Sequence, residues 1–226
     1  MARVLPDGLA GRVAELLARH ERVILGVAGS PGAGKSTLAT QVVEHFSGRG
    51  VPAAWVPMDG FHLADIELDR LDRRRFKGAI DTFDAHGYLA TIERIAREMG
   101  NTVYAPAFDR AIEEPIAGSV PVLPGTRLVV TEGNYLLDES EPWNRVPDVL
   151  TEIWFVDVDD GLRRERLIRR HIRFGKTPAE ARDWVRAVDE PNARRIHRTR
   201  FRAALIVSPD ALPSDIESTD YAQGKA

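Results

Sequence analysis

The sequence predicts an α/β fold, a five-stranded and mostly parallel sheet with helices on both faces. Short apolar runs rich in β-branched residues alternate along the chain with longer segments whose apolar residues recur at helical spacing. The short runs are apolar throughout, which is typical of strands that are covered on both sides. Of the 226 residues, 43% are hydrophobic, so the chain can bury a sizeable core, and we expect a single domain over 1–226.

The first half of the chain supplies two helices and two strands before a charged stretch. Apolar side chains on one face predict the helices, and continuous apolar runs predict the strands. In order, the elements are a helix from Leu9 to about His20, a strand at 22–28, a helix through Leu38 and Phe46 that stops at Gly48, a strand at 53–58 and an irregular segment at 63–80.

In the second half of the chain strands again alternate with helices, which predicts a parallel sheet. In such sheets function lies at the C-terminal ends of the strands, so we expect the functional residues there. Gly and Pro punctuate one segment in a way that is typical of a hairpin. The elements are a helix from about Gly87 to Met99, an extended stretch at 102–110, a hairpin at 116–124, strands at 127–131 and 153–158, helices from about Gly161 to Arg173 and about Pro178 to Val188, a strand at 203–207, and a tail at 208–226 that we expect to be flexible.

One stretch, GSPGAGKS from Gly29 to Ser36, matches the phosphate-loop (Walker A) pattern at every fixed position. The strand before it and the helix after it place backbone N–H groups at the positive end of a helix dipole, where a polyphosphate binds. The sequence therefore predicts a P-loop NTPase fold that binds ATP. We expect Lys35 to reach the β- and γ-phosphates and the Ser36 hydroxyl to ligate Mg²⁺. The residues expected to bind the nucleotide are Gly29, Ser30, Pro31, Gly32, Ala33, Gly34, Lys35, Ser36 and Thr37, with Arg163 from later in the chain.

Two acidic residues at strand ends are expected to lie beside this loop. Asp59 directly follows the strand at 53–58 and could accept the proton of a substrate hydroxyl; the alternative is a carboxylate that caps a turn. Glu132 resembles a Walker B acid in part, because that pattern would place Asp where Thr131 stands. We expect Glu132 close to Mg²⁺, with a capping role as the alternative. His62 shares the strand end with Asp59 and is a candidate for substrate binding.

A basic helix is expected to form a helical lid at about 160–177. Arg163, Arg166 and Arg170 lie at i, i+3 and i+7 and therefore share one face. Three guanidinium groups on one face can close over a phosphoryl group and stabilise its charge during transfer. The alternative is a solvated charged face, which Glu165 would partly neutralise.

Substrate-binding candidates also come from the extended stretch at 102–110. Tyr104, Phe108 and Arg110 suit the binding of a small polar substrate, although both aromatic residues could equally belong to the core. The basic cluster from Arg70 to Lys77 is expected at the surface.

Composition and charge disfavour several classes of protein. The net charge of −3 gives no general affinity for nucleic acid or anionic membranes, and no apolar run approaches the ~18 residues of a membrane span. The absence of cysteine excludes disulfides, thiolate metal sites and a cysteine nucleophile. We therefore expect a cytoplasmic protein whose partners are ATP and a small molecule, with neither nucleic acid nor membrane. The oligomeric state stays open, with a homodimer as one alternative.

Several stretches together resemble the superfamily of uridine kinases, phosphoribulokinases and type I pantothenate kinases. They are the phosphate loop, Met58 to His62, Lys77 to Asp84, Tyr104 to Arg110 and Thr131 to Leu136, followed by the arginines of the basic helix. The sequence is most similar to bacterial nucleoside/nucleotide-kinase-like proteins, some of them named fructose transport system kinases. The resemblance implies ATP- and Mg²⁺-dependent phosphoryl transfer to an alcohol, with Asp59 as the base, Arg166 and Arg170 on phosphates, and Asp81 among the residues that bind the acceptor.

The class of acceptor is left open among nucleosides, pantothenate-like compounds and sugars. Uridine kinases carry an aspartate that grips the ribose diol, and Gly78 stands at that position here. Two other functions are alternatives to a kinase: a regulatory ATPase or GTPase that uses hydrolysis as a switch, and a nucleotide sensor without catalysis. The sequence has no Asn-Lys-x-Asp motif for guanine, which disfavours a GTPase.

Overall fold

The computed structural model describes residues 5–208 of the chain. Its helices are α1 (Asp7–Arg19), α2 (Lys35–Ser47), α3 (Asp65–Arg70), α4 (Ala85–Arg97), α5 (Val146–Val149), α6 (Asp160–Arg173), α7 (Pro178–Trp184) and α8 (Glu190–His197). Its strands are β1 (Val23–Gly29), β2 (Ala53–Pro57), β3 (Val103–Asp109), β4 (Glu114–Val122), β5 (Leu128–Gly133), β6 (Glu152–Val156) and β7 (Leu205–Val207). The part of the predicted flexible tail from 209 to 226 lies outside the described residues.

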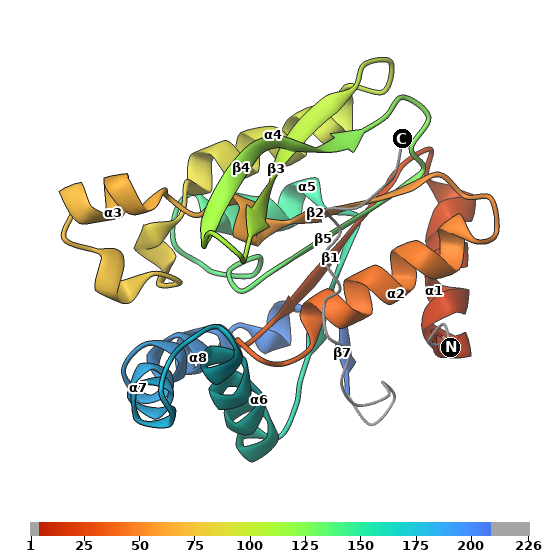
Figure 1. Cartoon of the computed structure of the whole chain (residues 1–226). Coiled ribbons are helices and arrows are strands. Elements are labelled where there is room, and N and C mark those ends of the chain that lie inside the picture. The colour runs from red at the N-terminus through yellow and green to blue at the C-terminus, as the bar shows by residue number, and fades with distance from the viewer. Residues whose placement is uncertain (1–4, 209–226) are drawn as a thin grey trace.

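Five strands form one parallel sheet in the order β2-β5-β1-β6-β7 (Figure 1). Each pair of neighbours in this sheet runs parallel, so all of its connections are crossovers that pass over a face. The predicted α/β fold is confirmed, and each expected strand is found within two residues of its predicted ends.

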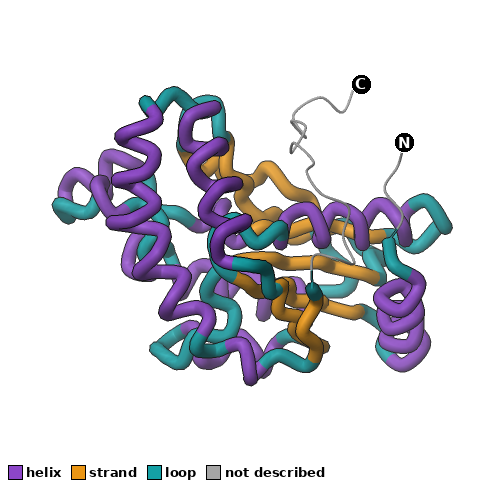
Figure 2. The backbone as a smooth tube through the Cα atoms, turned by 90° about the horizontal axis from the view of Figure 1, so that it is seen from below, coloured by secondary structure: helices purple, strands orange, loops and turns teal. Residues whose placement is uncertain are grey.

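Apolar clusters cover both faces of the sheet, as β1 illustrates. Because side chains of a strand alternate between faces, Ile24 packs in one cluster with Ile92 of α4, whereas Leu25 packs in the other with Leu38 of α2. Figure 1 shows α1 and α2 on one side of the strands and α4 and α5 on the other, and the turned view in Figure 2 shows the strands lying between helices. A sheet buried in this way leaves its C-terminal edge as the place for polar function.

Strands β3 and β4 form a separate antiparallel hairpin, and its location differs from the prediction. We expected the turn of a hairpin within 116–124, but most of these residues lie in β4, and the chain turns at 110–113 instead. The Gly and Pro residues of β4 do not end the strand because it is an exposed edge strand, where a missing N–H costs little.

The helical segment after α6 is longer than expected. The predicted helix at 178–188 is found as α7, which continues through one π-helical turn, Val185–Asp189, into α8. Within 5–208, no helix combines the length and apolar character that crossing a bilayer requires.

Candidate active site

The parallel register brings the ends of three neighbouring strands together. Glu132 of β5 lies opposite Val27 of β1 on one side and opposite Pro57 of β2 on the other. The phosphate loop begins at Gly29, directly after this point of β1, and Asp59 follows Pro57 after one intervening residue. A phosphate-binding loop and two carboxylates therefore share one edge of the sheet.

The phosphate loop requires glycine at two positions. Gly32 and Gly34 have φ angles of 79° and 98°, a region that favours glycine. A Cβ on Gly32 would also lie 2.9 Å from the carbonyl oxygen of Arg163 and 2.8 Å from Cγ of Leu167, so α6 packs directly against the loop. Gly34 immediately precedes α2, whose first N–H groups are available to an anion.

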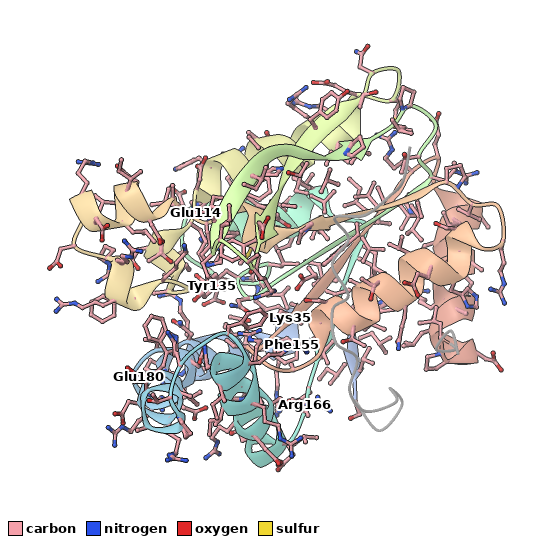
Figure 3. The ribbon with its side chains drawn as sticks, viewed as in Figure 1. Lys35, Glu114, Tyr135, Phe155, Arg166 and Glu180 are labelled. Carbon is pink, nitrogen blue, oxygen red and sulfur yellow. The ribbon has the colours of Figure 1, made fainter. Side chains whose placement is uncertain are left out.

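The side chains of Lys35 and Ser36 are held in place at the start of α2. Lys35 is 8% exposed, and its Nζ donates a hydrogen bond to the carbonyl oxygen of Ser30 at 3.1 Å. The Ser36 hydroxyl donates to Oε1 of Glu132, also at 3.1 Å. Figure 3 shows Lys35 between the sheet and α6. The loop, its lysine and the acid of β5 thus form one connected group.

Burial and mutual repulsion set the charges of this group. Burial, together with the negative charge of Asp59, raises the pKa of Glu132 to about 7, although Lys35 opposes the shift. Burial also lowers the pKa of Lys35, and the charges of Glu132 and Asp59 offset part of that shift. Glu132 is therefore close to half-protonated at neutral pH and would be ionised by a nearby cation.

Asp59 forms an ion pair with Arg110 of the hairpin turn. Nη2 of Arg110 lies 3.2 Å from Oδ2 of Asp59, and each side chain is about one-third exposed. Burial opposes ionisation of Asp59, but the positive charges of His62 when protonated, of Arg110 and of Lys35 outweigh it and lower the pKa of Asp59. At neutral pH Asp59 is a carboxylate that can accept a hydrogen bond.

A glycine lets the hairpin approach Asp59. Gly60 lies in a single 3₁₀ turn after β2, and a Cβ there would be 2.3 Å from the carbonyl oxygen of Pro106 in β3. His62 follows this turn, and its ring centroid lies 3.9 Å from that of Phe83 and 5.0 Å from that of Phe108. Asp59, His62, Phe108 and Arg110, all predicted to bind substrate, are therefore neighbours.

The oxygen ligands at this edge fit a magnesium ion. The donor set consists of the Ser36 hydroxyl and the carboxylates of Glu132 and Asp59, and Mg²⁺ prefers such hard oxygen ligands. A cation here would also relieve the repulsion that raises the pKa of Glu132. In the described part of the chain no three His, Cys, Asp or Glu residues form a metal-binding cluster.

Two arginines of α6, the helix that we predicted to form a lid, lie near this site. A Cβ on Gly34 would lie 3.9 Å from Nη1 of Arg166, so this guanidinium lies against the phosphate loop. Figure 3 shows Arg166 on α6. Arg170 is half-buried, and burial and the nearby charge of Arg110 lower its pKa, while Asp189 and Asp59 oppose the shift. Arg110 and Arg170 therefore both place positive charge near Asp59.

Arg163, which we expected to bind the nucleotide, has a different environment. Its side chain is 2% exposed, Nε donates to Asp160 at 3.1 Å, and Nη2 is paired with Glu190 of α8. Arg163, Arg166 and Arg170 do share one face of α6, as predicted. One end of this face is buried in the protein interior, and the other end lies at the site. Arg163 occupies the interior end and ties α6 to α8, a structural role that we did not expect, and its binding of the nucleotide stays a prediction.

Two substrate-binding candidates also lie away from the group around Asp59. Tyr104 is 61% exposed and precedes Arg110 by six residues of extended chain, about 20 Å. The Asp81 carboxylate is 54% exposed and forms an ion pair with Arg73 at 2.6 Å. Strand length thus separates Tyr104 from the group around Asp59, and a local ion pair engages Asp81, so substrate binding by these two residues stays a prediction that the geometry does not support.

The structure also assigns a contact that the sequence did not predict, between the irregular segment and the hairpin. Lys77 is 13% exposed rather than at the surface, and its Nζ contacts Asp65 at 2.5 Å and the carbonyl oxygen of Glu113. Glu114 accepts a hydrogen bond from the Asp65 backbone N–H at 3.0 Å. These contacts fasten the hairpin turn that carries Arg110. A lysine within a run of arginines gave no signal of this role.

Comparisons with known proteins agree with this geometry. Residues 24–208 match the model of the phosphoribulokinase / uridine kinase family. A Schizosaccharomyces pombe protein named as a candidate uridine kinase is 32% identical over 210 residues, which cover 90% of this chain and 88% of that protein. The ATP-dependent kinase-like protein notR' of Aspergillus versicolor is 36% identical over 64% of this chain and 89% of its own length. The crystal structure of a candidate fructose transport system kinase from Silicibacter sp. TM1040 is 32% identical, has a TM-score of 0.80, and is matched over 88% of this chain and 98% of that one.

Proposed function

Because the chain belongs to the phosphoribulokinase and uridine kinase family, we propose that it is an ATP-dependent kinase that transfers the γ-phosphoryl group to a hydroxyl of a small metabolite. Nucleosides, pantothenate-like compounds and sugars are the acceptor classes to test. The observation that carries the proposal is the convergence of Lys35, Ser36, Glu132 and Asp59 at three adjacent strand ends. In this arrangement the phosphate loop and Lys35 would bind the phosphates of ATP, and the carboxylate of Asp59 would face the incoming hydroxyl.

Each group has a role that its position supports. The loop amides and Lys35 bind the phosphates, and Ser36 and Glu132 hold Mg²⁺, which neutralises charge on the phosphate oxygens when bound. Asp59 accepts a hydrogen bond from the incoming hydroxyl and aligns it, kept ionised by Arg110. Because phosphoryl transfer depends mainly on positioning and electrostatics, these fixed contacts are the chief contribution of the protein.

The arginines of α6 act as a lid in this proposal. Arg166, beside Gly34, would contact the transferred phosphoryl group, and Arg170 would approach it from the side of Asp59. A cytoplasmic location, the absence of nucleic acid and membrane partners, and a homodimer remain predictions.

The proposal is tested by measuring ADP formation from ATP and Mg²⁺ with each acceptor class in turn. A kinase shows ADP formation that depends on one acceptor and yields a phosphorylated product in equal amount. Equal ADP release with and without every acceptor would instead indicate a regulatory ATPase. Nucleotide binding without any ADP release would indicate a sensor.

A further inference from the structure

Tyr88 of α4 connects the two strand ends that carry the carboxylates of the site. Its side chain is fully buried, and its hydroxyl forms a 2.8 Å hydrogen bond with the hydroxyl of Thr131, which is also fully buried. Its ring packs edge-on against Phe61, with 5.2 Å between the ring centroids and 86° between the ring planes. Thr131 directly precedes Glu132 in β5, and Phe61 lies two residues after Asp59. One side chain therefore contacts a near neighbour in sequence of each carboxylate.

The two ends of this connection differ in how firmly the backbone is held. β5 is a central strand, hydrogen-bonded to β1 on one side and to β2 on the other, and the β1 and β2 pairings both include Thr131. Asp59 instead lies in a 3₁₀ turn of four residues, Met58–Phe61, whose hydrogen-bond geometry is poorer than that of regular structure. The position of Asp59 therefore depends on the elements that this turn packs against. They are the hairpin at Gly60 and α4 at Phe61.

The hydroxyl of Tyr88 fixes the place of its ring. The ring lies between Phe61 and Trp143, whose ring centroid is 5.5 Å away, and aromatic packing is favourable over a range of offsets. The hydrogen bond is directional, so it selects one of these positions. Because side chains of a strand alternate between faces, Thr131 faces α4 while Glu132 faces α2. Tyr88 thus acts from the face of the sheet opposite the phosphate loop.

We propose that Tyr88 is a positioning residue for phosphoryl transfer, which holds the turn that carries Asp59 in a fixed place relative to β5. This inference rests on the proposed kinase function. Without the hydroxyl, the ring and the turn shift together, and Asp59 is less often placed to accept from the incoming hydroxyl. The inference also gives a role to Thr131, the residue at which the sequence departs from the Walker B pattern: its hydroxyl anchors Tyr88.

Three variants of the hydrogen-bonded pair test the proposal. Tyr88→Phe removes one hydroxyl and keeps the ring, so we expect kcat for the true acceptor to fall about three- to tenfold, the range for one hydrogen bond. The KM for ATP should not change, because Lys35 and the loop amides are untouched. Thr131→Val removes the same bond and should lower kcat by the same factor, whereas Thr131→Ser keeps a hydroxyl and should retain most of the rate. An unchanged kcat in Tyr88→Phe, or a rise in the KM for ATP that matches the loss of rate, would overturn the proposal.

Tyr135→Phe is the matched control for the loss of a buried hydroxyl. Tyr135 is also fully buried, and its hydroxyl donates at 2.8 Å, but to the carbonyl oxygen of Gly78 rather than to a strand. This variant should lose a similar amount of stability while kcat stays within about twofold. In an Asp59→Asn background, Tyr88→Phe should lower kcat no further, since it acts through Asp59. Equal losses of kcat in Tyr88→Phe and Tyr135→Phe, or full additivity with Asp59→Asn, would refute the positioning role.

Amide hydrogen exchange tests the inference without turnover. The backbone N–H of His62 donates to the carbonyl oxygen of Asp59 at 3.2 Å and therefore reports on the turn. Its exchange should be about three- to tenfold faster in Tyr88→Phe than in the unchanged protein, and slower in Tyr135→Phe than in Tyr88→Phe. Equal exchange in the two variants would overturn the inference even if a kinase acceptor is found. If exchange is as expected but no acceptor stimulates ADP formation, the kinase proposal fails, and the role of Tyr88 in transfer fails with it.

Discussion

Replacing Asp59 by Asn tests the role of this carboxylate with little change in shape. The substitution removes the negative charge that pairs with Arg110 and leaves an oxygen that can still accept a weaker hydrogen bond. Because both side chains of the pair are about one-third exposed, we expect the free energy of unfolding to fall by less than about 1 kcal/mol. For a domain of this size that corresponds to a change in Tm of about 2–4 °C at most.

The activity should change far more than the stability. A positioned proton acceptor raises a rate by a factor of about 10²–10⁴. Because phosphoryl transfer is catalysed mainly by positioning and electrostatics, we use the lower end of this range and expect kcat to fall about 100-fold. The affinity for ATP should stay within about threefold, because Lys35 and the loop amides are untouched. The pKa of Glu132 should fall below about 7, because the charge of Asp59 is one of the causes that raise it.

The assay is acceptor-dependent ADP formation, with ATP affinity measured separately by calorimetry. Asp183→Asn is the matched control, since it makes the same chemical change at an exposed ion pair, here between Asp183 of α7 and Arg186 of the π-helical turn. Full turnover of the true acceptor by Asp59→Asn would remove Asp59 from the proposed role. A loss of ATP binding that equals the loss of rate would place Asp59 in nucleotide binding instead.

Three further predictions follow from buried charges. The folded-state pKa of Glu132, about 7, exceeds its usual 4.5, so the folded protein retains a proton that the unfolded chain releases. Stability should therefore fall as the pH rises from 4.5 to 7, by up to about 3 kcal/mol, and urea titrations of Glu132→Gln should lack this slope. Arg163→Met should destabilise the fold by about 3 kcal/mol in the same assay because it removes the buried partner of Glu190 and leaves that carboxylate only the exposed Arg164, 3.9 Å away, whereas Arg164→Met should cost less than about 1 kcal/mol. Lys77→Met should raise KM for the acceptor several-fold with KM for ATP unchanged, since it releases the hairpin turn; equal changes in both constants would contradict this.

The sheet could be predicted from the sequence because its signals are local. Five continuous apolar runs and a glycine loop between a strand and a helix fix the element types, and alternation along the chain fixes the parallel arrangement. The hairpin was predicted too far along the chain, at 116–124, because we took its Gly and Pro residues as signs of a turn. An exposed edge strand such as β4 tolerates these residues, so here they do not mark a turn. The extension of α7 into α8 was missed because charged residues there hide a narrow apolar face, which includes Ala193 and Ile196.

The site was predictable to the extent that it depends on strand ends. Asp59 and Glu132 follow core strands directly, and the register then places them beside the phosphate loop. The roles of Arg163 and Lys77 could not be predicted in this way, since each is decided by partners distant in sequence: Glu190 for Arg163, and the hairpin turn for Lys77. Helical spacing in a sequence shows which residues share a face of a helix, but it does not show which of those residues pack against the core.

The position of Arg163 also constrains how a lid could move. The first turns of α6 are fixed, because Gly32 of the phosphate loop packs against Arg163 and Leu167, and the buried ion pair joins them to α8. Farther along α6, His171 pairs with Asp189 at 2.9 Å, so this end is also tied to the π-helical turn before α8. These contacts imply that α6 and α8 move as one body. Closure over a nucleotide would then change the contact between this body and the phosphate loop at Gly32, where only a residue without a side chain allows α6 to pack so closely.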